Sequence, residues 1–376
     1  MEDKLRIIIS GGGTGGHIFP AVSIANAIKL KYPEAKILFV GADGRMEMQR
    51  VPAAGYEIKG LPIAGFDRKN LLKNFSVILK LLRSQLMARK IIKDFKPQVA
   101  VGVGGYASGP TLKMAGMMGV PTLIQEQNSY AGVTNKLLAK KACKICVAYD
   151  GMDKFFEKEK IILTGNPVRQ GLIDKSLTRE EAVRSFGLDP EKKTILVIGG
   201  SLGARTLNEC MIAGIDKIKE SDIQFIWQTG KIYFDNAKKS FTEAGSPSLV
   251  YVTDFISDMA KAYKAADLVI SRAGAGSISE FCLLKKSVIL VPSPNVAEDH
   301  QTKNALALVN KNAAIYVKDA AANEILIDKA IEAVKDNQLL NNLSSNIEKL
   351  AFTDSAEIIA DEVYKLAQKY IKEHGC

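Results

Sequence analysis

The same local pattern opens both halves of this 376-residue chain: an apolar run, a glycine-rich loop and a helix-like segment. The run at 4–10 leads into glycines at 11–16, and the run at 194–198 leads into glycines at 199–203. Apolar runs and helix-like segments alternate after each opening, which is typical of βαβ units and of a parallel sheet with helices on both faces. We therefore predict an α/β chain of two doubly wound domains facing a cleft, with ligands at the carboxyl ends of the strands.

Glycine, proline and charged residues interrupt this alternation over 164–190, a composition typical of a connection between domains. We expect an N-terminal domain over 1–163, a linker region over 164–190 and a C-terminal domain over 191–354. The tail at 355–376 has the periodicity of one amphipathic helix, which we expect to join the N-terminal domain. The pattern predicts a first helix at 20–30 and strands at 4–10, 36–40, 98–103, 121–125, 194–198, 224–228, 249–252, 268–271 and 287–292.

Positive charge is concentrated in the first half of the chain. Residues 1–166 hold 25 Lys and Arg against 13 Asp and Glu, a net charge of +12, whereas residues 167–376 hold 26 against 28, a net charge of −2. A basic domain predicts an anionic partner. Nucleic acid is not expected to be that partner, because no recognition motif is visible.

The segment 68–93 carries eight cations and no acid, interleaved with leucines and other apolar residues. This pattern predicts an amphipathic helix that lies on an anionic membrane surface. An ordinary core-facing helix with a solvated basic face remains the alternative. The residues expected to face the membrane are Lys73, Phe75, Leu79, Lys80, Leu82 and Arg83.

No run of about 18 uncharged apolar residues occurs, and the first ten residues hold only a three-residue apolar core. We therefore expect neither a membrane span nor a signal peptide, and a cytoplasmic protein. Cys143 and Cys146 form a C-x-x-C pair, which could serve redox chemistry or bind zinc. Because no second pair or nearby histidine completes a site, we favour two reduced cysteines beside a strand.

The first glycine loop fits G-x-G-x-x-G, which allows a ligand to approach the backbone and the N-terminus of the next helix. It is not a P-loop, because His17 and Ile18 stand where Lys and Ser or Thr are required. A dinucleotide site also needs an acid at the end of the second strand, and Asp43 is the one candidate. A nicotinamide-dependent oxidoreductase is thus a less favoured alternative.

His17 stands at the end of this loop, directly before the expected helix. Imidazole titrates near neutral pH, so a histidine in this place suits a general base, or a contact to phosphate or sugar. A capping or structural histidine is the alternative.

A third glycine loop, at 271–280, follows a strand and opens a helix, so its N–H groups can hold a pyrophosphate. Glu280 could accept two hydrogen bonds from a ribose diol, and a capping glutamate at N3 is the alternative. In the polar loop at 292–304, Gln301 and Asn304 could bond sugar hydroxyls, unless this is a plain surface loop. No D-x-D occurs, so helix N-termini and arginine would have to stabilise a leaving pyrophosphate without a metal.

Taken together, these motifs resemble those of the MurG family of bacterial glycosyltransferases. The segments that carry the resemblance are GGGTGGHIFP at 11–20, QEQNSYAGVTNK at 125–136, TGNPVR at 164–169, GGSLGARTLN at 199–208, VTDFISDMA at 252–260, 272–280 and DHQTKNA at 299–305. They run in the family's order over nearly the whole chain. The resemblance implies a GT-B fold of two Rossmann-like domains, no cofactor, and inverting transfer of N-acetylglucosamine from UDP-N-acetylglucosamine to lipid I, which gives lipid II for peptidoglycan. It also implies a peripheral protein on the cytoplasmic face of the cell membrane.

The family's site residues fall on matching positions of this chain, with Glu280 on the ribose, Ile256 at the uracil, Ser201 at the pyrophosphate and Gln301 at the N-acetylglucosamine. The full donor set that the resemblance implies is Thr14, Gly15, Gly16, Asn128, Arg169, Ser201, Ile256, Ala275, Gly276, Ser277, Ile278, Ser279, Glu280 and Gln301. The second glycine loop of the first domain is expected to bind the acceptor through Gly104, Gly105 and Tyr106, with tight packing as the alternative.

Two departures from the family are modest: the loop at 272–276 is richer in glycine, and Gln125 stands where many members have histidine. The rival functions are a UDP-N-acetylglucosamine 2-epimerase on the same architecture, the oxidoreductase above, and a non-catalytic nucleotide-sugar binding protein. The last is disfavoured because both domains keep complete loops and the chain keeps His17.

Overall fold

The computed structural model describes residues 5–63, 74–168, 171–174, 176–200 and 202–374. Its contacts divide the chain into unit 1, which is Met1–Arg169 with Phe352–Cys376, and unit 2, which is Gln170–Ala351. The expected linker is therefore not a separate segment, because most of it belongs to unit 2. Its residues form helix α6 (Arg179–Arg184), which packs against α10 (Met259–Ala265).

The sequence of α6 explains why the supposed linker folds. Thr178 and Glu181 form a capping box, in which each side chain bonds the backbone N–H group of the other residue. The Arg179 guanidinium then donates to the carbonyl oxygens of Pro190 and Lys192 and forms an ion pair with Asp267. These contacts attach the segment to the unit 2 sheet.

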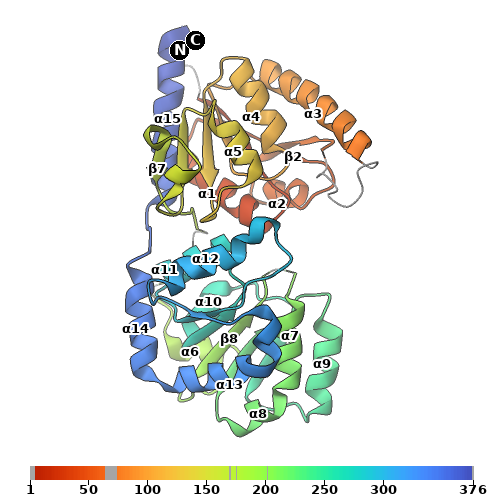
Figure 1. Cartoon of the computed structure of the whole chain (residues 1–376), viewed down its shortest axis with the longest axis vertical. Coiled ribbons are helices and arrows are strands. Elements are labelled where there is room, and N and C mark those ends of the chain that lie inside the picture. Colours follow the sequence, from red (N-terminus) through yellow and green to blue (C-terminus); the bar gives the residue numbers. More distant parts are fainter. Residues whose placement is uncertain (1–4, 64–73, 169–170, 175, 201, 375–376) are drawn as a thin grey trace. The chain divides into compact units, whose positions relative to one another are not determined.

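Unit 1 is built on a seven-stranded parallel sheet in the order β3-β2-β1-β4-β5-β6-β7, with helices on both faces (Figure 1). Its strands are β1 (Arg6–Ser10), β2 (Lys36–Ala42), β3 (Glu57–Leu61), β4 (Val99–Gly102), β5 (Thr122–Glu126), β6 (Lys144–Val147) and β7 (Ile161–Leu163). Its helices are α1 (Gly15–Lys31), α2 (Glu47–Ala53), α3 (Asn74–Phe95), α4 (Ser108–Met117), α5 (Val133–Ala139) and α15 (Ser355–His374).

Unit 2 repeats this plan with a six-stranded parallel sheet in the order β10-β9-β8-β11-β12-β13. Its strands are β8 (Thr194–Ile198), β9 (Gln224–Gln228), β10 (Val250–Thr253), β11 (Leu268–Ser271), β12 (Val288–Leu290) and β13 (Ile315–Tyr316). Its remaining helices are α7 (Arg205–Ala213), α8 (Ile215–Glu220), α9 (Phe234–Glu243), α11 (Ala275–Leu283), α12 (His300–Val309), α13 (Ala322–Lys335) and α14 (Asn337–Glu348). The two doubly wound parallel-sheet domains predicted from the sequence are thus confirmed.

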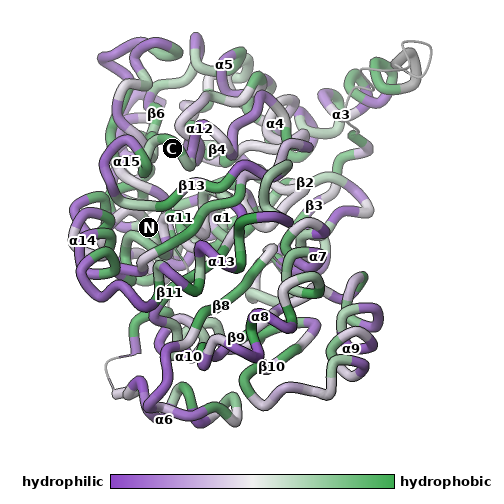
Figure 2. The backbone as a smooth tube through the Cα atoms, turned by 60° about the horizontal axis from the view of Figure 1, so that its bottom comes forward, coloured by the Kyte–Doolittle hydropathy of each residue, from purple (hydrophilic) through white to green (hydrophobic). Residues whose placement is uncertain are grey.

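The central strands contain continuous hydrophobic runs because helices cover both faces of each sheet. Ile7, Ile8 and Ile9 of β1 are all fully buried, although they point alternately to opposite faces. Figure 2 shows the same continuous hydrophobicity along β8. Among the described residues, no helix combines the length and the apolar character needed to cross a membrane.

The first helix begins earlier than the sequence suggested. The expected start was Pro20, a residue favoured in the first turn of a helix, but α1 begins at Gly15 and contains Pro20 within it. His17 consequently lies in the first turn of α1 rather than before it.

Candidate functional site

Both sheets place a glycine loop at the point where their strand order reverses. In unit 1 the chain moves from β1 to β2 on one side and later returns to β4 on the other, and in unit 2 β8 lies between β9 and β11 in the same way. Ligands of doubly wound sheets bind at such switch points, beyond the carboxyl ends of the strands. The loops after β1 and β4, and those after β8 and β11, therefore form the candidate site of each unit.

The two glycine loops of unit 1 pack directly against each other. A side chain on Gly105 would overlap the carbonyl oxygen of Gly12, and a Cβ on Gly104 would lie 2.8 Å from Nε2 of His17. Both Gly104 and Gly105 also have positive φ angles, of 92° and 83°. Tight packing therefore requires glycine at both positions, whereas the neighbouring Tyr106 has an exposed side chain.

His17 is held by the loop that precedes it. Its Nδ1 lies 2.9 Å from the carbonyl oxygen of Gly12 and 3.4 Å from the Thr14 hydroxyl. A carbonyl oxygen can only accept a hydrogen bond, so Nδ1 carries the proton in this contact. In the neutral ring the lone pair is then on Nε2, the nitrogen next to Gly104.

A buried carboxylate, that of Glu126, organises the segment around Asn128. Glu126 ends β5, is 1% exposed, and accepts hydrogen bonds from the backbone and side-chain nitrogens of Asn128 at 3.0 and 3.2 Å. It also accepts from Gly132 and from the Asn135 amide. Buried amides continue this network, because Gln125 donates to Asn166 and Asn166 donates to the carbonyl oxygen of Gln127. Glu126 was not expected from the sequence, where its only signal is its place between two polar residues at a strand end.

In unit 2, Gln228 connects the loop after β8 to the segment that contains Ile256. The Gln228 side chain donates to the carbonyl oxygen of Gly200 at 3.0 Å and accepts from the backbone N–H of Ile256 at 3.1 Å. The N–H group of Ile256 is therefore bonded within unit 2 and does not face a ligand while this bond is formed. Gly203 lies so close to the carbonyl oxygen of Thr229 that no side chain would fit there.

The start of α11 presents the N–H groups of Ala275, Gly276 and Ser277. Gly274 is the N-cap, and the first hydrogen bond of the helix runs from Ile278 to Gly274, so these three donors precede the helical ladder. The positive end of the helix dipole adds to them, which makes this end a suitable anion site.

Glu280 is the sixth residue of α11, so the alternative that it caps the helix at N3 is wrong. It is 6% exposed, and its Oε2 accepts a hydrogen bond from the Tyr263 hydroxyl at 2.7 Å. Tyr263 itself is buried against Phe281, with ring centroids 5.8 Å apart. The carboxylate is thus held by a buried tyrosine about one and a half turns below the helix start.

Arg272, at the start of the third loop, directs its guanidinium at groups within unit 2. Its guanidinium forms an ion pair with Asp319 and donates to the carbonyl oxygen of Val291 at 3.0 Å. Asp319 also accepts from Thr206 in the first turn of α7. This carboxylate therefore links the loops after β8 and β11, and in the described part of the loop after β11 the N–H groups at the start of α11 are available donors for an anion.

The polar loop at 292–304 leads into α12, which begins at His300. Gln301 is half-buried, and its side-chain oxygen accepts from the backbone N–H of Ser293 at 2.8 Å. The expectation that Asn304 bonds a sugar is wrong, because its side chain is fully buried and donates to the carbonyl oxygen of Ala273. Arg169, Ser201 and Lys73 lie outside the described residues, as does the side chain of Phe75.

In the C-x-x-C pair, the buried cysteine, Cys146, is a poor nucleophile. Cys146 lies in β6, where burial raises its pKa to about 12, so the nucleophilic thiolate is disfavoured. Within the described ranges, no group of three or more His, Cys, Asp or Glu residues could hold a metal ion.

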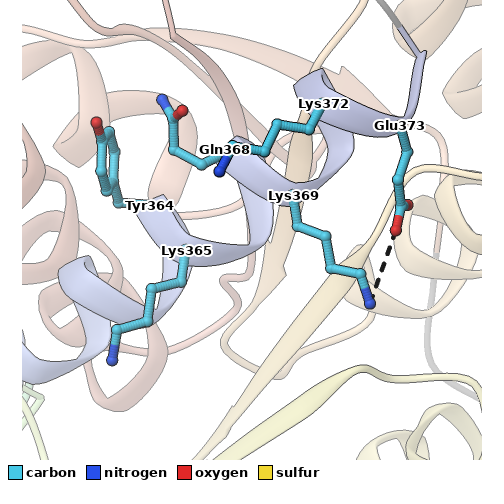
Figure 3. Close-up of a pocket in the computed structure, with 6 residues that line it drawn as sticks. All are labelled: Tyr364, Lys365, Gln368, Lys369, Lys372 and Glu373. Atoms are coloured by element: carbon cyan, nitrogen blue, oxygen red, sulfur yellow. Dashed lines mark ion pairs between the residues drawn. The ribbon is translucent and has the colours of Figure 1, made fainter.

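A cavity of about 450 Å³ on α15 is lined by no residue of either switch point (Figure 3). All of its lining residues belong to that one helix, which makes it an open surface hollow rather than a built site. They are Tyr364, Lys365, Gln368, Lys369, Lys372 and Glu373.

Comparison with known proteins matches both units. The glycosyltransferase family 28 N-terminal domain matches residues 7–147, and the glycosyltransferase family 28 C-terminal domain matches residues 194–359. A protein of Phocaeicola vulgatus named "UDP-N-acetylglucosamine--N-acetylmuramyl-(pentapeptide) pyrophosphoryl-undecaprenol N-acetylglucosamine transferase" is 78% identical over 375 residues, which is 100% of each chain. A Bacteroides fragilis protein of the same name is 72% identical over 98% of this chain and 97% of its own length.

Solved structures agree with these relatives. MurG of Acinetobacter baumannii has a TM-score of 0.76 at 26% identity, over 96% of this chain and 99% of that one. A UDP-GlcNAc 2-epimerase from Neisseria meningitidis has a TM-score of 0.67 at 12% identity, over 96% and 100%, and this likeness concerns the fold alone. On these matches, the chain belongs to glycosyltransferase family 28, and within it to the MurG family that its motifs resemble.

Proposed function

We propose that this glycosyltransferase transfers N-acetylglucosamine from UDP-N-acetylglucosamine to the 4-hydroxyl of N-acetylmuramic acid in undecaprenyl-pyrophosphoryl-MurNAc-pentapeptide, lipid I, and so forms lipid II. The observation that carries this proposal is the full-length match to transferases named for this donor and acceptor, at 72–78% identity. The 2-epimerase alternative rests on a shared fold at 12–14% identity and is not favoured. An assay with labelled UDP-N-acetylglucosamine and a lipid I analogue tests it: lipid II is the expected product, and epimerised donor alone would contradict it.

The donor is held mainly by unit 2. The N–H groups at the start of α11 bind the pyrophosphate, Glu280 binds the ribose, and the segment at Ile256 receives the uracil. Gln301 contacts the N-acetylglucosamine. The further donor residues are Thr14, Gly15, Gly16, Asn128, Arg169, Ser201, Ile278 and Ser279.

The acceptor hydroxyl attacks the anomeric carbon of the donor as UDP leaves, which inverts the configuration at that carbon. His17 is the general base, because its Nε2 holds a lone pair while Nδ1 is bonded to Gly12. Gly104, Gly105 and Tyr106 contribute to acceptor binding beside this base. The helix dipole of α11 stabilises the charge that develops on the departing pyrophosphate.

Turnover is expected to change by less than about twofold in excess EDTA, because backbone N–H groups and a helix dipole stabilise the leaving group. The measurement is the rate of lipid II formation with and without the chelator, at fixed substrate concentrations. A loss of activity that magnesium or manganese restores would contradict the metal-independent mechanism.

The protein meets its lipid acceptor as a peripheral protein on the cytoplasmic face of the cell membrane. One side of helix α3 buries Val77, Ala88 and Ile92 in unit 1, which agrees with the alternative that this helix faces the core. The same helix also exposes four large apolar side chains, 47–69% exposed, between its cations, and Figure 2 shows hydrophobic and hydrophilic stretches alternating along it. These apolar residues are Ile78, Leu79, Leu82 and Leu86. An exposed apolar stripe among cations suits insertion into an anionic lipid surface.

Reversing two cations of α3, with Lys80→Glu and Arg83→Glu, is expected to weaken binding to anionic vesicles by about 30-fold or more, since each cation near such a surface contributes about 1 kcal/mol. Co-sedimentation with phosphatidylglycerol vesicles measures this. The control has the same charge change on α9 of unit 2, Lys238→Glu with Lys239→Glu, and should bind like the unaltered protein. Equal binding by both variants would reject the membrane role of α3.

A further inference from the structure

A buried carboxylate, that of Glu47, lies against the first glycine loop of unit 1. Glu47 is the first residue of α2 and only 1% exposed. Its Oε2 accepts a hydrogen bond from the backbone N–H of Gly13 at 2.8 Å, and its Oε1 accepts one from Ala42 at 3.0 Å. Both carboxylate oxygens are therefore engaged by the backbone, one at the glycine loop and one at the end of β2.

Two glycines make room for this carboxylate. A Cβ on Gly12 would overlap the Glu47 carboxyl group, and a Cβ on Gly41 would lie 2.6 Å from its Cγ. The side chain thus fills the space between the loop and β2. The N–H of Gly13, which a dinucleotide-binding loop could direct at a phosphate, is already bonded to an internal anion, which argues against the nicotinamide alternative.

The peptide group between Gly12 and Gly13 connects Glu47 to His17. Its N–H donates to the Glu47 carboxylate, and its carbonyl oxygen is the acceptor for Nδ1–H of His17 at 2.9 Å. The N–H and C=O of a planar trans peptide point in opposite directions, so the carboxylate and the imidazole lie on opposite sides of one rigid unit. A carboxylate on the N–H side polarises the peptide and makes its oxygen a stronger acceptor.

We propose that Glu47 is a positioning residue, which fixes the ring orientation and the Nδ1–H tautomer of His17 through the Gly12–Gly13 peptide. Its part resembles that of the aspartate in a Ser-His-Asp triad, with a peptide group placed between carboxylate and imidazole. No proton moves to Glu47. The inference rests on the proposed role of His17 as the base, because the tautomer leaves Nε2 able to accept the acceptor's proton.

The first test measures the unaltered protein and uses a variant only to assign the His17 signal. The chain has three histidines, so ¹⁵N spectra of its imidazoles contain few signals, and the signal lost in His17→Ala identifies His17. The neutral ring of His17 is expected to show the Nδ1–H tautomer. A predominant Nε2–H tautomer in the unaltered protein would overturn the proposal, whatever any variant does.

The second test is Glu47→Gln, which keeps the size of the side chain but brings an NH₂ group against a backbone N–H. We expect a mixed tautomer at His17 and a kcat lowered by about 10- to 100-fold, since small misplacements of a catalytic group can cost that much. The KM for UDP-N-acetylglucosamine should stay unchanged, because unit 2 carries most of the donor contacts. Glu57→Gln, an exposed glutamate of β3, is the matched control and should leave both readouts unchanged.

Two outcomes separate this inference from the proposed function. A folded Glu47→Gln variant with the ring spectrum of the unaltered protein overturns the positioning role. Normal turnover by His17→Ala overturns the base assignment, while the ring spectra still report whether Glu47 holds the imidazole. If Glu47→Gln does not fold, Glu47→Asp, whose shorter side chain cannot reach both N–H groups, takes its place in the same measurements.

Discussion

Replacing His17 with alanine is expected to lower kcat by about 10²- to 10⁴-fold, the usual contribution of a general base. The dissociation constant for UDP-N-acetylglucosamine should change little, because the N–H groups of α11 and Glu280 belong to unit 2. Single-turnover kinetics with a lipid I analogue measure the catalytic rate. Calorimetric titration with UDP-N-acetylglucosamine measures the dissociation constant. A lower kcat with unchanged donor binding is the pattern of a group that acts in the transition state.

His374→Ala is the control for this substitution, because this histidine lies exposed on the last turn of α15. It should turn over normally. If His17→Ala also turned over normally, the proton would have to leave through another group. If donor binding fell in parallel with kcat, His17 would be a binding residue rather than a base.

Glu280→Ala is expected to raise the dissociation constant for UDP by about 10- to 100-fold. Hydrogen bonds to a charged group contribute about 1.5–3 kcal/mol, and a ribose diol would make them to this carboxylate. The effect should be as large for UDP as for the whole donor, because the lost contact is to the nucleotide. Titration of both ligands measures this, and the turnover of bound donor should fall less than the affinity.

Tyr263→Phe separates ribose binding by Glu280 from a purely structural role. This substitution removes the hydroxyl that donates to Glu280 at 2.7 Å but keeps the buried ring against Phe281. UDP affinity should then fall much less than in Glu280→Ala. Equal losses of UDP affinity in the two variants would mean that the carboxylate only stabilises the position of α11. The ribose contact would then be removed from the proposal.

The strands that the sequence predicts best are the central ones. Strands β8, β9 and β11 have the bounds expected from their apolar runs, because both of their faces are covered and the middle of each strand is apolar. The strands expected from the sequence do not include β3, β6, β7 or β13. β3 alternates exposed Glu57 and Lys59 with partly buried residues, and β13 has two residues at an edge of its sheet. Their pairing depends on the neighbouring strand rather than on their own composition.

The glycine loops were also predictable, because glycine positions and the strands before them are visible in the sequence. The side chains that hold these loops were not. Glu47 lies 34 residues from Gly13, and Asp319 lies 113 residues from Thr206, so no local pattern marks either contact. Such long-range hydrogen bonds form only after the sheet has brought distant segments together. In the sequence they are marked by no more than a single polar residue.

The division of the chain has a consequence for how it is made. Unit 2 is one continuous stretch, Gln170–Ala351, inserted into unit 1, whose last helix follows it. Helix α15 fills part of the unit 1 core with Ile359, Ala360 and Val363, packed against α1 and near β4. On the ribosome, unit 2 can fold while unit 1 still lacks this helix, so the growing chain carries an open apolar face until Ser355–His374 emerges. The newly made chain should depend on chaperones during synthesis, and a stop codon before Ser355 should cause aggregation even though unit 2 is complete.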